Sequence, residues 1–258
     1  MLKYIKIQNW TKMYILFSPS EGKKLGGEHP QLNKENLLFP ELFDKRLPLL
    51  NEYNQLISQA TLDVLQKLTG IKKESEINKY KNDLITSPTM PSLERYDGVA
   101  YDYLELSSLK PEQKAFLFKQ TIIFSNLFGP ILGGDMIPSY KFKQGALLNT
   151  TATEKIYKKE FSSSLDKLLE NELVLDLRAG FYEKFYALNQ NFITMKFLKN
   201  GKSVSHWAKA YRGKVLQTLS KVQPKNEDEL RNIVYEGLNF IEAIPYKKKG
   251  TMLVYEVL

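Results

Sequence analysis

Met13-Tyr-Ile-Leu-Phe17 runs directly into Ser18-Pro-Ser-Glu-Gly-Lys23. The first five residues are apolar and are stopped by a serine and a proline, which predicts a short buried strand followed by a loop. A second apolar run, Leu173–Leu177, is followed in a similar way by Arg178-Ala-Gly180. Because ligands often bind beside the loops at strand ends, we expect functional residues in the loops after these two strands.

Charged and polar side chains near these loops are candidates for a ligand-binding cleft. Glu21 with Lys23, and Asp176 with Arg178, place opposite charges at the two strand ends. A structural salt bridge would explain either pair as well. The order Gly-x-x-x-x-Gly-Lys-Ser/Thr is missing, so a triphosphate-binding loop of that kind is not supported. The cleft candidates are Ser18, Glu21, Tyr101 and Asp176.

The remaining pattern mixes helices and strands without a regular alternation, which favours one compact α+β domain over a doubly wound fold. Met13 is the expected start of this domain, residues 13–258, so that residues 1–12 form an N-terminal extension outside the native protein. The expected helices are Lys45–Leu68 as one helix or two, Pro111 to about Phe124, Phe161–Leu169, a segment carrying Phe181–Tyr186, Ala208–Val222 and Glu227–Val234. The expected strands include Phe192–Leu198, Asn239–Ala243 and Thr251–Val257, with Ser125–Gly145 as a structured loop.

Composition excludes several classes of chemistry. The 258 residues contain no cysteine and two histidines, which removes disulfides, thiolate zinc sites, iron–sulfur clusters, cysteine nucleophiles and multi-histidine metal cages. We therefore expect no cofactor and no metal site. No stretch approaches the roughly 18–20 consecutive apolar residues of a membrane-spanning helix, so we expect no membrane partner.

The positive charge is concentrated in one window. Lys and Arg number 37 against 29 Asp and Glu, a net charge of +8, and the window 183–225 contains nine basic residues and one acidic, which is also +8. Such a segment is typical of a protein that binds a polyanion, although a lysine-rich surface gives the same count. Lys209 and Arg212, three residues apart, are expected on one helix face, with Gly213 allowing a close backbone approach. Trp207 is expected in the core.

The segment Leu65–Lys73 has the spacing of a helix-hairpin-helix DNA-binding element. In such elements the hairpin glycine, here Gly70, exposes backbone N–H groups to a phosphate, and flanking lysines such as Lys67 and Lys72 add charge. A helix that ends in a glycine C-cap gives the same string, so the two alternatives stay open.

Several motifs together resemble the peroxide stress protein YaaA family, over nearly the whole chain from Met13. These motifs are Tyr14-Ile-Leu-Phe-Ser-Pro-Ser-Glu-Gly-Lys23, Tyr96-Asp-Gly-Val-Ala-Tyr101, Ser125-Asn-Leu-Phe-Gly129 with Asp135, Tyr140-Lys141, Asp176-Leu-Arg178 with Tyr182, and Lys209-Ala-Tyr-Arg-Gly213. The chain departs from the family at Leu132-Gly133, where an Arg-Pro pair is usual, and at Lys141, where an arginine is usual. Losing the arginine at position 132 removes a bidentate phosphate donor from that loop.

The resemblance implies a cytoplasmic protein that limits oxidative damage by keeping intracellular iron low under peroxide stress. It also implies a compact α+β fold of its own kind and DNA binding through a positively charged cleft and a helix-hairpin-helix element at Leu65–Lys73. The predicted partner is the phosphate backbone of DNA, bound by a monomer. The predicted DNA- or anion-binding residues are Lys23, Lys67, Thr69, Gly70, Lys72, Lys141, Arg178, Lys209 and Arg212.

Two other functions stay open. The first is an enzyme that acts on a small anionic or nucleotide-like substrate, with Lys23 or Lys209 as base or nucleophile beside Tyr101 or Asp176. The second is iron chelation by the protein itself, which two histidines and no cysteine serve poorly.

Overall fold

Strand β1 (Met13–Phe17) is the buried strand that its apolar run predicts, and all five of its residues are buried in this computed structural model. It pairs in parallel with β6 (Thr121–Ser125) on one side and with β9 (Leu173–Asp176) on the other. The two neighbours are also buried throughout. A parallel strand that is covered on both faces has no polar side, which explains these continuous apolar runs.

The structure describes residues 12–258, apart from the side chains of Ser205 and His206. The predicted N-terminal extension lies outside the described residues, except for Lys12. Within the described part of the chain, no helix is long and apolar enough to cross a membrane.

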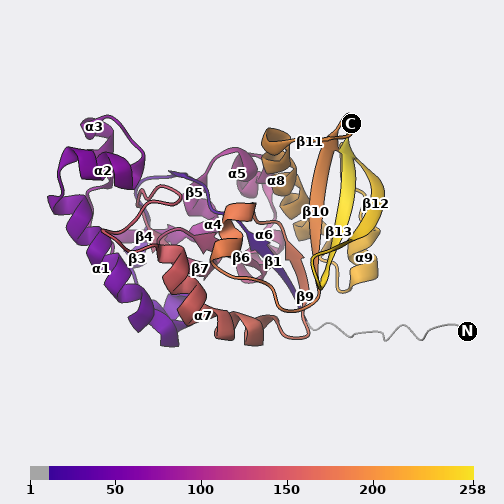
Figure 1. Ribbon diagram of the computed structural model, residues 1–258, viewed down its shortest axis with the longest axis horizontal. Coiled ribbons are helices and arrows are strands. Elements are labelled where there is room, and N and C mark those ends of the chain that lie inside the picture. Colours follow the sequence, from indigo (N-terminus) through magenta and orange to yellow (C-terminus); the bar gives the residue numbers. More distant parts are fainter. Residues whose placement is uncertain (1–11) are drawn as a thin grey trace, which may run out of the picture.

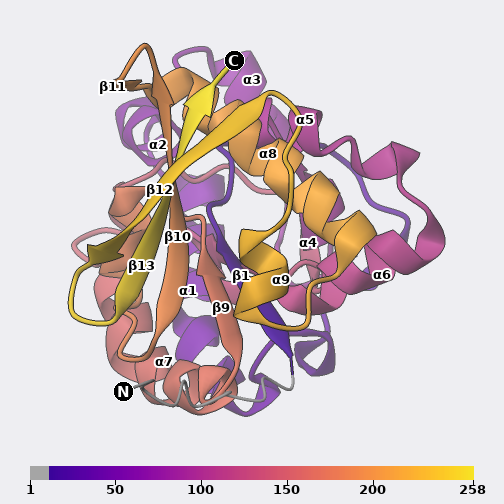
Figure 2. The ribbon, with the colours of Figure 1, turned by 90° about the vertical axis from the view of Figure 1, so that its right-hand side faces the viewer.

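A mixed sheet forms the centre of the molecule, with the strand order β12-β13-β10-β9-β1-β6-β7 and β11 attached to β10. The contacts from β13 through β10, β9 and β1 to β6 are parallel, while β12 and β7 add antiparallel edges. Figure 2 shows β12, β13, β10, β9 and β1 side by side, with α8 (Ser205–Val222) and α9 (Glu227–Arg231) beside them. The remaining strands of this sheet are β7 (Gly129–Leu132), β10 (Phe192–Lys199), β11 (Lys202–Ser203), β12 (Leu238–Tyr246) and β13 (Gly250–Val257).

Two small sheets and the helices surround this centre. The small sheets pair β2 (Gly22–Lys23) with β5 (Tyr96–Asp97), and β3 (His29–Gln31) with β4 (Pro88–Pro91) and β8 (Met136–Pro138). Helices α1 to α3 lie at the opposite end of the molecule from β10, β12 and β13 (Figure 1). The helices are α1 (Phe43–Gln59), α2 (Leu62–Thr69), α3 (Glu74–Ile77), α4 (Ser92–Arg95), α5 (Val99–Leu104), α6 (Pro111–Gln120), α7 (Thr153–Leu169), α8 (Ser205–Val222) and α9 (Glu227–Arg231).

The prediction of a single mixed domain is confirmed, and the segment 45–68 forms two helices, α1 and α2. The predicted helix after Pro111 is too long, because α6 ends at Gln120 and residues 121–124 belong to β6. Thr, Ile and Phe at these positions fit a buried pleated surface better than a helix. The segment 125–145 is less irregular than predicted, since it contains β7 and β8. The segment after Ala179 forms a short 3-10 helix, η5 (Gly180–Lys184).

Candidate functional site

A cavity of about 570 Å³ lies at the carboxyl end of β1. In the sheet, β1 lies between β6 on one side and β9 on the other, so the strand order reverses at β1. Open sheets with parallel strands commonly bind ligands at the carboxyl ends of the strands at such a topological switch point. We call it the central cavity, and its lining residues are Phe17–Gly22, Asp97–Tyr101, Gln144, Ala179, Tyr182, Lys209 and Arg212. Three of the four cleft candidates, Ser18, Glu21 and Tyr101, therefore share one site.

The loop after β1 is fixed on both sides. The Tyr101 hydroxyl donates to the Ser18 carbonyl oxygen at 2.9 Å, and the Ala179 N–H donates to Ser18 Oγ at 2.8 Å. Gly22 pairs with Asp97, and a Cβ at Gly22 would lie 2.5 Å from the Asp97 carbonyl oxygen, so only glycine permits this approach. The wall of the cavity is thus held in place before any ligand binds.

Lys209 and Arg212 of α8 both line the central cavity, and their spacing of three residues places them on one face of the helix. Lys209 is exposed, whereas Arg212 is half-buried, and burial lowers the pKa of its guanidinium while the charge of Asp176 raises it. Within the described residues, no group forms a hydrogen bond or an ion pair with the guanidinium of Arg212. A partly buried arginine with no partner is costly, and an anion in the cavity would supply the missing contacts.

Gly213 brings α8 against α5, as the sequence predicts. A Cβ at this position would lie 2.0 Å from the Ala100 carbonyl oxygen. We expect Gly213→Ala to lower the free energy of unfolding by about 1–3 kcal/mol, because the two helices must move apart. Urea denaturation checks this, with Gly180→Ala as the control because a Cβ there meets no atom within 4 Å. Equal stability of the two variants would show that α8 does not need this close contact.

Lys23 lies beneath the loop and does not line the cavity. Its side chain is only 6% exposed, and its amine donates to the Ser20 carbonyl oxygen at 3.0 Å and lies 4.3 Å from the centre of the Tyr140 ring. Burial, together with the charges of Lys141 and Arg95, lowers the pKa of Lys23 to about 7, against the opposing effect of Glu21. The amine is therefore placed to support the loop rather than to face a polyanion.

The loop after β8 links the central cavity to the predicted hairpin. Lys141 donates from its amine to the Glu21 carbonyl oxygen at 2.8 Å, and burial lowers the pKa of Lys141. Gln144 lines the central cavity and also a second cavity, of about 500 Å³, together with Lys67 and Lys143. The hairpin and the central cavity are therefore neighbours in space, although about 45 residues of sequence separate Lys23 from Lys67.

The hairpin itself begins at the end of α2. Gly70 has a φ of 74° and caps α2, and its N–H donates to the Gln66 carbonyl oxygen at 2.8 Å. Thr69 is buried, and its hydroxyl accepts from the Ile71 N–H at 3.2 Å. Lys67 and Lys72 are exposed. The N–H groups of Gly70 and Ile71 are thus engaged inside the turn, and the helix-hairpin-helix assignment stays a prediction, since α3 contains four residues.

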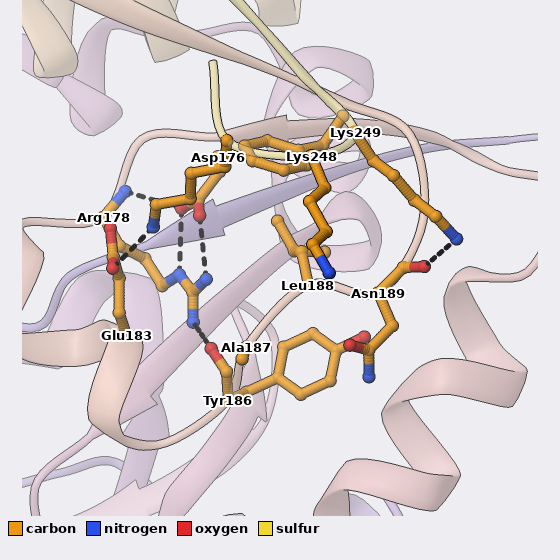
Figure 3. Close-up of a pocket in the computed structure, with 11 residues that line it drawn as sticks. Asp176, Arg178, Glu183, Tyr186, Ala187, Leu188, Asn189, Lys248 and Lys249 are labelled. Atoms are coloured by element: carbon orange, nitrogen blue, oxygen red, sulfur yellow. Dashed lines mark hydrogen bonds and ion pairs between the residues drawn. The ribbon is translucent and has the colours of Figure 1, made fainter.

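Asp176 and Arg178 line a separate cavity of about 490 Å³, shown in Figure 3. The guanidinium of Arg178 forms a bidentate ion pair with Asp176, with N–O distances of 2.9 and 2.8 Å, and also donates to the Tyr186 carbonyl oxygen at 2.9 Å. It stacks 4.5 Å from the centre of the Phe124 ring. Arg178 is therefore held by contacts within the protein, and its pair with Asp176 is a structural salt bridge.

The comparisons with known proteins agree with the motifs. Residues 13–244 match the family model described as peroxide stress protein YaaA. The chain belongs to this family. It is 49% identical over 246 residues to an uncharacterized protein of Campylobacter jejuni, which covers 95% of this chain and 100% of that protein. It is 32% identical over 252 residues to a UPF0246 protein of Corynebacterium glutamicum, with 94% and 100% covered. A UPF0246 protein of Streptomyces coelicolor is 29% identical over 266 residues, with 95% and 100% covered.

The departure of this YaaA-family chain at Leu132 and Gly133 falls in a tightly packed turn. The carboxylate of Asp135 accepts from the Leu132 N–H at 2.9 Å and from the Leu38 N–H at 2.6 Å. A Cβ at Gly133 would lie 2.9 Å from the Leu117 carbonyl oxygen. Burial raises the pKa of Asp135 to about 7, against the opposing effects of these hydrogen bonds and of Arg46. The turn is held by an internal carboxylate, which leaves little reason to expect an anion site there.

Asp97, Tyr182 and Gln144 also line the central cavity and are not among the predicted site residues. Asp97 and Tyr182 lie within motifs that resemble the family, and Gln144 carries no recognisable signal. The prediction that Trp207 lies in the core is wrong, because its side chain is 47% exposed at the first turn of α8. Among the described residues, no group of three or more His, Cys, Asp or Glu side chains is placed to hold a metal ion.

Proposed function

We propose that this YaaA-family protein binds DNA, mainly through the phosphate backbone, as its part in the response to peroxide. The half-buried guanidinium of Arg212, which has no partner among the described residues, is the observation that carries this proposal. A phosphate would give it the bidentate, charge-assisted contact that no described residue provides. Lys209, exposed on the same side of α8, would contact the same phosphate or its neighbour.

The distribution of charge favours a long polyanion over a single small anion. The +8 window 183–225 runs through β10, β11 and α8, and so extends well beyond the central cavity. Neutralising several phosphates releases condensed counterions and gives most of the affinity of non-specific DNA binding. On the other side of the cavity, Lys67 and Lys72 supply a second contact through their side chains, because the hairpin N–H groups of Gly70 and Ile71 are already bonded.

The link to peroxide stress rests on the family to which the chain belongs. In the proposed function DNA is the direct ligand, and the limit on intracellular iron is an effect downstream of DNA binding. The rival enzyme needs a reactive lysine that faces a substrate. Lys209 lines the central cavity with Tyr101, whereas Lys23 is covered and Asp176 lies in a different cavity, so only part of that arrangement is brought together.

We expect Arg212→Ala to weaken binding to duplex DNA by roughly ten- to a hundredfold, since a charge-assisted contact contributes about 1.5–3 kcal/mol. The slope of log affinity against log salt should also fall by about 0.9, the value for one phosphate contact. Fluorescence anisotropy across a salt series measures both quantities.

The matched control is Arg231→Ala, because Arg231 pairs with Glu227 on α9, outside the window and the cavity. Its affinity should equal that of the native protein. Native affinity and slope in Arg212→Ala would contradict the placement of phosphate on Arg212. No binding by the native protein near physiological salt would contradict the proposed function and favour the enzyme.

A further inference from the structure

The central cavity is larger than a phosphate contact requires. Its volume of about 570 Å³ lies within the range of roughly 300–1,000 Å³ that is typical of sites for whole small molecules. Lys209 and Arg212, which are adjacent on one face of α8, account for only one part of its lining. The rest of the lining must therefore suit another chemical group attached to the anion.

The lining of the cavity carries both signs of charge. Besides the two cations of α8, it contains the carboxylates of Glu21, in the loop before β2, and Asp97, in the paired strand β5. In the described residues neither carboxylate forms an ion pair, and Glu21 Oε1 accepts only a 3.4 Å hydrogen bond from the Gln144 N–H. Carboxylates repel a second phosphate, but they accept hydrogen bonds from the amino and ring N–H groups of nucleobases.

Aromatic side chains complete the lining. Tyr101 and Tyr182 are both buried at the cavity wall, and Tyr101 is fixed by its hydrogen bond to Ser18 and by an edge contact with Phe17 at 5.7 Å. Rigid aromatic walls favour a flat ring, because stacking or edge contacts then cost little conformational entropy. Cationic, acidic and aromatic side chains in one cavity together match the phosphate and the base of a nucleotide.

We propose that the central cavity receives a single nucleotide turned out of the DNA duplex, with its phosphate on Lys209 and Arg212 and its base toward Glu21 and Asp97. This inference rests on the DNA binding proposed above. A base inside a duplex has its hydrogen-bonding edge paired, so it reaches such a cavity only when it leaves the stack. Unstacking costs a few kcal/mol and costs least at a mismatch, so mismatched sites are the best substrates for the test.

The experiment uses a duplex with 2-aminopurine at one mismatched position, because this base fluoresces more strongly when it is unstacked. We expect the fluorescence to rise when the native protein saturates the duplex. Val99→Phe should lower the rise, since Val99 lines the cavity and the larger ring occupies part of its volume. Gln144→Trp, at an exposed position of the lining, is a second filling variant that does not disturb the core. Val234→Phe is the matched control, because Val234 is 88% exposed and lies outside the cavity.

The affinity for a fully matched duplex, measured by anisotropy, separates this inference from the proposed function. A smaller fluorescence rise in both filling variants, with each protein at a concentration that saturates the mismatched duplex by anisotropy, supports the cavity as the site of the nucleotide. DNA binding by the native protein without any rise, or an undiminished rise in the filling variants, overturns the inference but leaves DNA binding intact. If the native protein binds no duplex, both fail. A titration with deoxyadenosine monophosphate alone then tells whether the cavity takes a free nucleotide.

Discussion

Replacing Arg46 with methionine is expected to lower the free energy of unfolding by about 3–5 kcal/mol, which is among the largest effects of a single substitution. The side chain is fully buried, and burial lowers the pKa of its guanidinium. Four carbonyl oxygens accept hydrogen bonds from this group at 2.6–3.2 Å, those of Leu38, Phe39, Phe128 and Pro130. Methionine removes the arginine donor from all four. The Phe39 carbonyl oxygen keeps its hydrogen bond from the Leu42 N–H at 3.0 Å, and each buried acceptor that is left unpaired costs about 1–3 kcal/mol before relaxation.

Urea denaturation followed by circular dichroism measures this loss, with Lys45→Met as the control. Lys45 precedes Arg46 in α1, is exposed and lies 3.7 Å from Glu160, so its removal should change the stability by less than about 0.5 kcal/mol. Arg46→Lys should recover only part of the stability, because one ammonium group cannot reach four separated carbonyl oxygens. A loss below about 1 kcal/mol in Arg46→Met would mean that water or a shifted backbone satisfies these carbonyl groups.

The strands at the centre of the sheet are predictable because each is an apolar run followed by a polar loop. β1 and β9 follow this pattern, and the glycine turn at residues 199–202 marks the end of β10. β6 cannot be recognised from the sequence, because its apolar residues follow α6 directly and a short apolar run fits a helix as well as a strand. β7 and β8 each contain a proline, which usually argues against a strand.

The sequence predicts the site residues whose chemistry and spacing agree. It does not predict whether a charged side chain is exposed to the cavity or buried beneath it. The spacing of Lys209 and Arg212 places both on the cavity, and Ser18, Glu21 and Tyr101 join them there. The sequence offers no sign that Lys23 lies under the loop or that Arg178 is fully used by contacts within the protein, because the rings and carbonyl groups that surround them come from distant segments. Asp97 was not predicted as a site residue, so the sequence did not show that the cavity contains two carboxylates.

Replacing Lys23 with methionine is expected to remove a large pH dependence of stability. In the folded protein the pKa of Lys23 is lowered to about 7, mainly by burial, whereas an unfolded lysine stays protonated up to about pH 10.4. Between these two values the unfolded state binds more protons than the folded state, so the stability due to this group rises with pH. Below about pH 7 both states are protonated, and the folded state carries the full cost of the buried charge.

The quantity to measure is the free energy of unfolding of the native protein minus that of Lys23→Met, at pH 7.5 and at pH 9.5. We expect this difference to increase by about 2–3 kcal/mol, since each pH unit in this window contributes up to about 1.4 kcal/mol. Tyrosines, with an unfolded pKa of about 10, begin to ionise near the upper end of this range, and their effect cancels because both proteins contain them. Lys24→Met, at the next and exposed position, is the control, and its difference should stay constant.

The result also decides between two opposing influences on the Lys23 amine. Burial beside Lys141 and Arg95 favours the neutral form, while the Ser20 carbonyl oxygen at 3.0 Å and the Tyr140 ring at 4.3 Å favour the charged form. A constant difference between pH 7.5 and 9.5 would mean that the carbonyl and ring contacts keep Lys23 protonated in the folded protein, and that the loop is held by a buried cation. A rising difference would mean that desolvation keeps the Lys23 amine neutral in the folded protein. The loop that forms one wall of the central cavity is then most stable when Lys23 is neutral.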